Sequence, residues 1–390
     1  MSKDRMVKAA VCTEPNKIEI QYFPYPEMEP GAAILKNIKS GVCGTDKHMF
    51  SGSVTLFKGT EKESSIPYPV IFGHEAVGII DDITPEGAKH LEYYGEELHP
   101  GDRVTYCPDV VCHECYYCRL TPWYPWCESP DRRNYGCLHS TTMKPSLFGS
   151  FAEYMYIFPK TYLYKVPDRL SDDLASCTEW MCVSYALDKA KEFFAFDGEG
   201  MAYGDTVVVL GCGPVGLAHV IKARMLGAGK IIVTDQSDFR LNIAKEFGAD
   251  VVMNVSKTTT EERIDIVRQH THGWGADIIC DCSGVKETVP EGLEMVRKGG
   301  MFIEPGQFVD RGPTPINMNL VCSKSIRIIG MANHAAAGYR PTMEMMLRYE
   351  KDFPWHKIVS HRFGLDEVDK AIRASMGLDC MKVIVEAWDK

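Results

Sequence analysis

The sequence predicts an α/β protein in which a doubly wound parallel sheet lies next to β-rich segments of chain. Residues 1–182 carry short alternating runs, such as residues 7–11, that are typical of antiparallel strands. Residues 183–334 alternate continuous apolar runs, such as residues 206–210, with stretches of helical spacing. Because strands that are apolar throughout are buried on both faces, this rhythm predicts a parallel sheet covered by helices on both sides. Residues 335–390 again mix short strand-like and helix-like stretches without this regular alternation.

Length, charge and cysteine usage limit the class of protein. The chain has 390 residues, which suggests two or three domains, and its 45% hydrophobic and 25% charged residues are typical of globular proteins. The net charge of -10 argues against a nucleic-acid or anionic-membrane partner. Without a membrane-length apolar run or a secretion signal, we expect a cytoplasmic protein. Because cytosolic cysteines stay reduced, the clustered ones predict metal ligands.

A glycine pattern follows the first apolar run of the middle region. Gly211, Gly213 and Gly216 form G-x-G-x-x-G directly after a predicted strand and directly before a predicted helix. The first glycine allows a tight turn, the second lets the backbone approach a pyrophosphate, and the third lets the helix pack on the strand. Pro214 and Val215 would begin the helix whose N-terminus receives the phosphates. The pattern therefore predicts a dinucleotide site in a Rossmann sheet.

An acidic residue at the end of the next apolar run indicates which dinucleotide is bound. Asp235 lies 19 residues after Gly216, a spacing typical of the carboxylate that accepts hydrogen bonds from the adenosine ribose. The same carboxylate repels a 2′-phosphate, so NAD is favoured over NADP. Arg240 lies five residues further on and is expected to line the adenine pocket. A less specific interpretation is a strand–helix turn with incidental glycines and a solvent-facing aspartate.

Four cysteines close together in the chain predict a structural zinc site. Cys112, Cys115, Cys118 and Cys127 have the pattern C-x2-C-x2-C-x8-C, and four thiolates can enclose one tetrahedral Zn²⁺ ion. They could instead be reduced cysteines without a metal, but three cysteines at x2 spacing seldom arise by chance. Cys107 lies just outside the pattern and is expected to be an ordinary core residue.

A second group of metal-ligand residue types lies nearer the N-terminus. Cys43 and His74 supply a thiolate and an imidazole, which together suit zinc. A third ligand would leave one position open, and a Zn²⁺ ion with an open position lowers the pKa of an alcohol oxygen. An alkoxide is what hydride donation to a nicotinamide needs, so this pair and the glycine pattern together predict a dehydrogenase. Taken alone, either residue would more often belong to the core.

Together these motifs resemble the zinc-dependent medium-chain dehydrogenase/reductase family, which includes alcohol, threonine, sorbitol and sugar dehydrogenases. The resemblance covers nearly the whole chain and rests on residues 41–46, 73–75, 100–104, 211–216 and 273–277, with Asp235 and the four cysteines. It implies a GroES-like catalytic domain formed by residues 1–182 and 335–390, with a structural zinc lobe at about 107–130. A Rossmann domain for NAD at residues 183–334 would be inserted in it. The resemblance also implies catalytic and structural zinc ions, an active site between the domains, and a homodimer or homotetramer.

The resemblance also assigns roles to single residues. Cys43 and His74 bind the catalytic zinc, and Asp46 orients His74 or a neighbouring basic group. Thr45 hydrogen-bonds the substrate oxygen. His48 passes the proton towards solvent, unless it is only a surface residue.

The third protein ligand of the catalytic zinc is open between two carboxylates. The family position falls within residues 175–185, where Glu179 lies on a predicted helix and Cys177 and Cys182 lie close enough to confuse the alignment. Polyol and sugar members usually have Glu-Pro there, and simple alcohol dehydrogenases have Cys, whereas this chain has Glu-Trp. Glu75 is the second candidate, since it coordinates the metal directly in some polyol-type members.

The resemblance implies an NAD-dependent oxidation of a secondary alcohol, and Glu179 favours a polyol, a cyclitol or another hydroxylated substrate. Aromatic residues such as Phe50 would equally suit an apolar cyclic alcohol, and basic residues such as Arg133 would suit an anionic one unless they are surface charges. Long segments at 52–65 and 84–100 read as loops and leave room for an unusual substrate. Two further functions stay open at this point: an NADH-dependent ketone or aldehyde reductase, and a non-catalytic redox-sensing protein on the same scaffold.

Overall fold

The structure is a computed structural model of the chain and describes residues 5–54, 63, 65–120, 126–129, 133–191 and 200–388. The chain divides into two compact units. The first unit comprises Met1–Glu179, Ala335–Glu350 and Ile358–Lys390, and the second comprises Trp180–His334 and Lys351–Lys357. No helix in the described residues is both long and apolar enough to span a membrane.

A short segment near the C-terminus joins the second unit, although the sequence texture places it in the first. The rings of Phe353 and Trp355 lie 5.9 and 6.1 Å from the ring of Phe247, which belongs to the second unit. Lys357 in the same segment forms an ion pair with Glu246. Aromatic packing therefore attaches this segment to the second unit.

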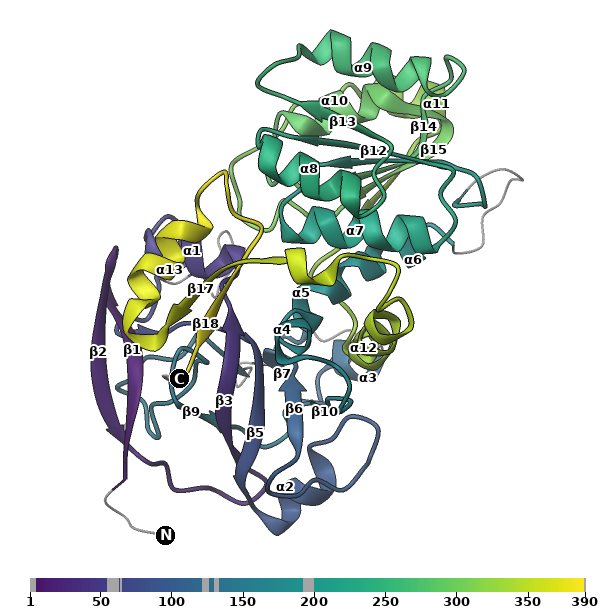
Figure 1. Cartoon of the computed structure of the whole chain (residues 1–390). Coiled ribbons are helices and arrows are strands. Elements are labelled where there is room, and N and C mark those ends of the chain that lie inside the picture. Colours follow the sequence, from purple (N-terminus) through teal and green to yellow (C-terminus); the bar gives the residue numbers. More distant parts are fainter. Residues whose placement is uncertain are drawn as a thin grey trace. The chain divides into compact units, whose positions relative to one another are not determined.

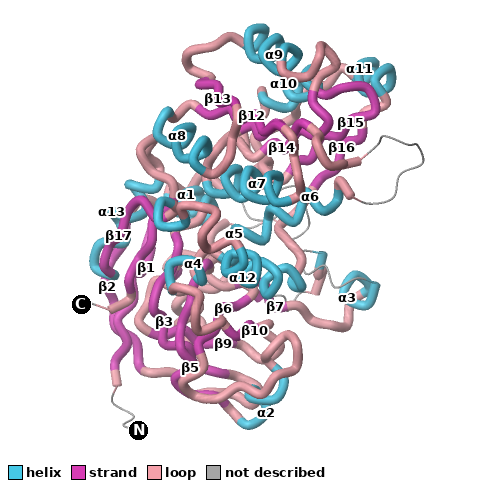
Figure 2. The backbone as a smooth tube through the Cα atoms, turned by 45° about the vertical axis from the view of Figure 1, so that its right-hand side comes forward, coloured by secondary structure: helices cyan, strands magenta, loops and turns pink. Residues whose placement is uncertain are grey.

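The first unit is rich in strands (Figure 2), and most neighbouring strands pair antiparallel, as expected. Its strands are β1 (Met6–Glu14), β2 (Lys17–Pro24), β3 (Ala33–Gly41), β4 (Val70–Ile71), β5 (Glu75–Ile83), β6 (Arg103–Tyr106), β7 (Asp109–Val110), β8 (Arg133–Asn134), β9 (Tyr154–Ile157), β10 (Leu163–Lys165), β17 (Val359–Gly364) and β18 (Lys382–Glu386). The main sheet has the order β10-β6-β5-β3-β18-β17, with β9 also paired to β3, and a smaller sheet has the order β2-β1-β4. The C-terminal strand β18 thus lies beside β3.

Short helices connect and cover these strands. They are α1 (Gly44–Phe50), α2 (Pro85–His90), α3 (Tyr116–Leu120), α4 (Asp172–Ala175), α5 (Thr178–Cys182), which crosses the boundary between the units, α12 (Tyr339–Arg348) and α13 (Val368–Ser375), with 3₁₀ turns η3 (Ala336–Gly338) and η5 (Leu365–Glu367). The prediction of a loop over residues 84–100 was wrong at α2. The Thr84 hydroxyl accepts the N–H of Gly87 at 3.1 Å and Pro85 begins the helix, which is a standard start signal. Much of the segment at 52–65, namely residues 55–62 and 64, lies outside the described residues.

The second unit is the predicted doubly wound sheet. Its strands are β11 (Thr206–Leu210), β12 (Lys230–Asp235), β13 (Val251–Asn254), β14 (Ala276–Asp281), β15 (Val296–Glu304) and β16 (Arg327–Gly330), and its helices are α6 (Ala186–Lys189), α7 (Pro214–Met225), α8 (Asp238–Glu246), α9 (Thr260–Gln269), α10 (Thr288–Met295) and α11 (Met318–Lys324), with 3₁₀ turns η2 (Val183–Tyr185) and η4 (Trp355–Lys357). The strands are parallel in the order β13-β12-β11-β14-β15-β16. Helices α7 and α8 cover one face, and α9 and α10 cover the other (Figure 1). Chain order reverses between β11 and β14, where such sheets bind ligands.

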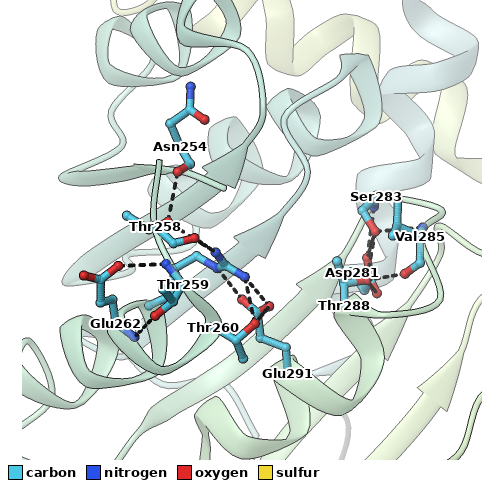
Figure 3. Close-up of polar contacts among 11 residues, drawn as sticks. Asn254, Thr258, Thr259, Thr260, Glu262, Asp281, Ser283, Val285, Thr288 and Glu291 are labelled. Carbon is cyan, nitrogen blue, oxygen red and sulfur yellow. Dashed lines mark hydrogen bonds and ion pairs between the residues drawn. The ribbon is translucent and has the colours of Figure 1, made fainter. Parts of the chain in front are cut away.

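A buried ion pair fixes α9 against α10. Arg263 donates to both carboxylate oxygens of Glu291 at 2.7 and 2.6 Å, and both side chains are more than nine-tenths buried. The hydroxyl of Thr260 donates to the same carboxylate, and the carbonyl and hydroxyl of Thr258 accept from Arg263 (Figure 3). Every N–H group of the buried guanidinium has a hydrogen-bond acceptor. These bonds offset much of the free-energy cost of burying the two charges.

Candidate functional site

The four-cysteine lobe of the first unit holds a complete set of zinc-ligand atoms. The sulfur atoms of Cys112, Cys115, Cys118 and Cys127 all lie within 4.8 Å of one another, which suits ligands around one tetrahedral ion. Over the described part of the chain, no other group of three or more such ligand residues meets this closely. Donor type, number and proximity therefore fit a closed zinc site.

Backbone N–H groups point at these sulfurs. Those of Glu114 and Cys115 donate to the sulfur of Cys112 at 3.3 and 3.2 Å. The N–H groups of Cys118 and Glu128 lower the pKa of Cys115 to about 6, because they stabilise the charged thiolate. Helix α3 in this lobe buries none of its side chains. A metal would therefore supply the cohesion that apolar packing does not.

The N-terminus of α1 positions Cys43 beside His74. Asp46 is fully buried, and its carboxylate accepts the N–H of Cys43 at 2.8 Å and the N–H of Gly73 at 3.1 Å. The same carboxylate lies 3.9 Å from Nδ1 of His74. One side chain thus ties together the two segments that carry the thiol and the imidazole, as expected of a residue that orients His74.

The side chain of His74 lies within electrostatic reach of two cysteines, Cys43 and Cys137. Burial raises the pKa of the Cys43 thiol, and the carboxylate of Glu75 raises it further. Burial lowers the pKa of His74, but the neighbouring groups of Cys43, Cys137 and Asp46 outweigh burial and hold it well above its ordinary value. Thiol and imidazole groups held in contact, with carboxylates nearby, are the donor types that a catalytic zinc ion takes.

The two carboxylates proposed as a third ligand have different surroundings. Glu75 is buried at the start of β5 and forms an ion pair with Lys382 of β18. The ammonium group of Lys382 also donates to the carbonyl of Val42 at 3.0 Å. Glu179 lies half-buried on α5. Burial raises the pKa of Glu75 and the charge of Glu179 adds to the rise, so the two carboxylates lie within electrostatic reach of each other.

Sequence analysis missed Lys382 and Cys137. Gly41 shows how tightly the Glu75–Lys382 pair is enclosed, because a Cβ atom there would collide with Glu75 and lie 2.7 Å from Cε of Lys382. No local pattern marks either residue. A glycine two positions before the expected ligand Cys43 was the one available signal.

Thr45 and His48 lie three residues apart on α1, so their side chains share a face of the helix. The hydroxyl of Thr45 lies 3.9 Å from the sulfur of Cys43. His48 is half-buried, and its Nδ1 lies 3.5 Å from the hydroxyl of Ser53. The helix therefore leads from the thiol of Cys43 towards a polar surface.

The glycine turn of the second unit leaves an open space before α7. Gly211 has a φ of +82°, and a Cβ atom on it would lie 2.7 Å from the backbone of Ser283. A Cβ atom on Gly216 would collide with the carbonyl of Gly211, whereas one on Gly213 would meet nothing within 4 Å. Gly213 precedes Pro214 at the start of α7. The turn fits a pyrophosphate on the free N–H groups of this helix.

Asp235 faces the glycine turn and is buried, so the interpretation as a solvent-facing aspartate is wrong. Its carboxylate accepts the N–H of Cys212 at 2.7 Å and the N–H of Ser237 at 2.8 Å. Since a carboxylate has about four acceptor positions, two remain for ribose hydroxyls. Arg240 lies in the first turn of α8, where its N–H donates to the capping hydroxyl of Ser237 at 3.1 Å.

Two family models match this chain. The alcohol dehydrogenase GroES-like domain matches residues 29–168, and the zinc-binding dehydrogenase model matches residues 214–348. The 5-exo-hydroxycamphor dehydrogenase of Pseudomonas putida is 28% identical over 97% of this chain and 98% of its own. The erythritol/L-threitol dehydrogenase of Mycolicibacterium smegmatis is 27% identical over 97% of this chain and 96% of its own.

Solved structures agree with these matches. An alcohol dehydrogenase from Thermotoga maritima has a TM-score of 0.84 and 29% identity, and the alignment covers 98% of this chain and 99% of that one. The GroES-like match lies in the first unit, and most of the zinc-binding dehydrogenase match lies in the second. The chain therefore belongs to the zinc-dependent medium-chain dehydrogenase/reductase family, in which it is an NAD-dependent zinc alcohol dehydrogenase.

Proposed function

We propose that this enzyme oxidises the secondary alcohol of a polyol, a cyclitol or another hydroxylated compound. The observation that carries the proposal is that two carboxylates, Glu75 and Glu179, lie near the Cys43–His74 pair. Carboxylates make the surroundings of this pair polar, and polar groups are costly to cover with an apolar substrate. The relative named erythritol/L-threitol dehydrogenase acts on such compounds by its name.

Cys43, His74 and Glu179 are the proposed ligands of the catalytic zinc. Glu75 is the less favoured candidate, because its carboxylate is neutralised by Lys382. Zinc bound there would act as a Lewis acid that lowers the pKa of the alcohol oxygen. Cys112, Cys115, Cys118 and Cys127 are the proposed ligands of the structural zinc.

Thr45 and His48 are the proposed path for the alcohol proton. The hydroxyl of Thr45 would accept the proton and give its own to the imidazole of His48, which releases it to solvent. This order follows their places on α1, where Thr45 is nearer to Cys43 and His48 is next to the exposed Ser53. For the cofactor, Gly211, Gly213, Pro214, Val215 and Gly216 would hold the pyrophosphate of NAD, and Asp235 and Arg240 its adenosine.

A panel of alcohols tests the substrate class. Initial rates of NAD⁺ reduction would be measured with simple alcohols, polyols, cyclitols, sugars, apolar cyclic alcohols and anionic alcohols. We expect kcat/KM to be highest for polyols or cyclitols. Turnover confined to apolar or anionic alcohols would overturn the proposal.

An apolar cyclic alcohol is the second candidate substrate, because the relative named 5-exo-hydroxycamphor dehydrogenase matches this chain over nearly its full length. The idea draws on aromatic residues in the sequence, among them Phe50, Phe57, Trp123 and Trp126. Phe50 is a fully buried core residue, and Trp126 lies half-exposed in the four-cysteine lobe. Against an anionic substrate, Arg133 is already engaged with Glu29 and the ring of Phe158. Phe57, Trp123 and Arg132 lie outside the described residues.

Replacing Asp235 by serine is expected to weaken the preference for NAD. The variant loses the acceptor for the ribose hydroxyls and the charge that repels a 2′-phosphate, so kcat/KM should fall at least about tenfold for NAD⁺ and rise for NADP⁺. Asp238→Asn is the matched control, since Asp238 is an exposed acid three residues further on, paired with Lys257. Equal loss with both cofactors would mean that Asp235 only supports the turn through Cys212.

We further propose a cytoplasmic homo-oligomer, a dimer or a tetramer. The edge strand β16 supports oligomerisation, because Ile328 on it is 43% exposed and Met318 nearby is 63% exposed. Light scattering of the purified protein decides between a monomer and the proposed states. No disulfide joins the cysteines of the described residues, which agrees with a reducing compartment.

A further inference from the structure

The carboxyl edge of the second unit's sheet carries two acids on neighbouring strands. Cys280 of β14 pairs with Ile303 of β15 in parallel register, so the next residues, Asp281 and Glu304, end the two strands side by side. Leu210, which precedes the glycine turn, pairs with Asp281 on its other side. Because doubly wound sheets bind ligands outside the carboxyl ends of their strands, this row borders the proposed NAD site.

The loops beyond these strands are packed directly on one another. A Cβ atom on Gly211 would lie 2.7 Å from the backbone of Ser283, in the loop after β14. A Cβ atom on Gly306, in the loop after β15, would lie 2.6 Å from the carbonyl of Asp281. The glycine turn, the loop after β14 and the loop after β15 are therefore consecutive neighbours along one edge.

Asp281 is fully satisfied by its own loop. One carboxylate oxygen accepts the N–H and the hydroxyl of Ser283 at 3.0 and 2.7 Å, and the other accepts the hydroxyl of Thr288 at 2.5 Å (Figure 3). Its role within the unit is to hold the turn between β14 and α10. It also places a carboxylate next to Glu304.

Only one of the two carboxylate oxygens of Glu304 has hydrogen-bond partners among the described residues. Its Oε1 accepts the N–H groups of Gly306 and Gln307, each at 2.9 Å. Its Oε2 and the Nε2 of Gln307 are buried, and neither has a hydrogen-bond partner among the described residues. Leaving a buried acceptor and a buried donor unpaired is costly. Two such atoms three residues apart therefore indicate a polar ligand.

The charges around Glu304 indicate which charge the ligand carries. Burial, and next the charge of Asp281, raise the pKa of Glu304 to about 7. The thiol of Cys282 lies within electrostatic reach of Glu304 and 3.5 Å from Nδ1 of His219, but burial keeps its pKa well above the ordinary value, so it stays neutral. At alkaline pH the edge carries carboxylates and no cation that faces Glu304 within these contacts. A positively charged group next to it would be favoured.

We propose that Glu304 and Gln307 bind the nicotinamide half of NAD and make the enzyme bind the oxidised, cationic ring more tightly than the reduced, neutral ring. Gln307 would donate to an oxygen of the nicotinamide riboside, and Glu304 would face the charge. This inference rests on the proposed NAD site of the second unit. By linkage, such a preference favours occupation of the site by NAD⁺ and release of NADH, and it makes hydride transfer to the bound cofactor less favourable by the same free energy.

Equilibrium binding without substrate tests this inference. The dissociation constants of NAD⁺ and NADH would be measured at pH 8.5 by calorimetry and fluorescence for the wild type, Glu304→Gln, Glu304→Asp and Gln307→Met. Glu304→Gln should weaken NAD⁺ roughly tenfold with little effect on NADH, and Glu304→Asp, which keeps the charge, should retain most of the preference. Gln307→Met should weaken both forms alike, since its partner is uncharged.

The matched control is Glu287→Gln, which removes an exposed acid at the N-terminus of α10, near the same edge. It should change the ratio of the two constants less than twofold. Equal effects of Glu304→Gln on NAD⁺ and NADH, or no effect on either, would overturn the inference. A wild-type protein that binds neither form would instead contradict the proposed NAD site itself.

Discussion

Replacing Cys43 by serine is expected to remove one zinc ion per chain and to lower the rate of NAD⁺ reduction about a thousandfold. The thiolate is one of three proposed protein ligands, and serine is a poor zinc ligand at neutral pH. Loss of the Lewis acid forfeits several kcal/mol of barrier lowering, and each 1.36 kcal/mol corresponds to a factor of ten in rate. Metal analysis by mass spectrometry and steady-state rates on the best alcohol of the panel measure both effects.

Cys322→Ser is the control for the loss of a thiol, because Cys322 is exposed on α11 of the second unit. It should keep both zinc ions and the wild-type rate. A Cys43→Ser protein that keeps full zinc content and full activity would show that Cys43 is an ordinary core residue. A variant that loses turnover yet keeps its biological effect would favour a non-catalytic, redox-sensing protein.

The parts of the site that the sequence predicts well are those whose residues are close in the chain. The four cysteines at x2, x2 and x8 spacing meet within 4.8 Å, because a few intervening residues leave the chain little choice in wrapping one ion. The glycine turn is predictable for the same reason, since Gly211 and Gly216 meet within a single strand–helix connection. Buried, uniformly apolar strands such as β11 likewise indicate the parallel sheet.

Partners from distant segments could not be predicted. Lys382 reaches Glu75 because β18 pairs with β3 in the register that brings Ile384 opposite Gly41. That pairing depends on the whole first unit, and a lysine in a C-terminal strand reads as a surface residue. Cys137 reaches His74 from a loop whose own sequence carries no spacing signal. The strand β13 was also not predicted, because its four residues are too few to show a period.

The two proposed metal sites differ more in the packing around their ligands than in the types of ligand. At Cys43 and His74, the ligands are held by a buried carboxylate, Asp46, and by packed strands, so the protein itself fixes their geometry. In the four-cysteine lobe, Tyr116 and Leu120 are 70% and 62% exposed, and little apolar packing is present. We therefore expect metal loss to affect activity at the first site and folding at the second.

Replacing Cys115 by serine is expected to unfold the four-cysteine lobe while the catalytic zinc and NAD binding remain. Cys115 has the thiol whose pKa is lowered to about 6, so it is the thiolate that is charged most readily at neutral pH. Losing the structural zinc should cost a few kcal/mol of stability, which corresponds to a drop in Tm of about 10 °C in a unit of this size. Calorimetry, zinc analysis and limited trypsin digestion measure the change, with new cleavage expected after Arg119 within the lobe.

Cys107→Ala is the matched control, since Cys107 is fully buried beside the lobe but does not belong to the group of four sulfurs. It should lower Tm modestly through a small cavity, retain both zinc ions and leave Arg119 protected from trypsin. If Cys115→Ser keeps two zinc ions and the same digestion pattern, the lobe is held by packing and the four thiols are not a metal site. Because the exposed side chains of α3 offer so little packing, we expect Cys115→Ser to lose the structural zinc and to unfold the lobe.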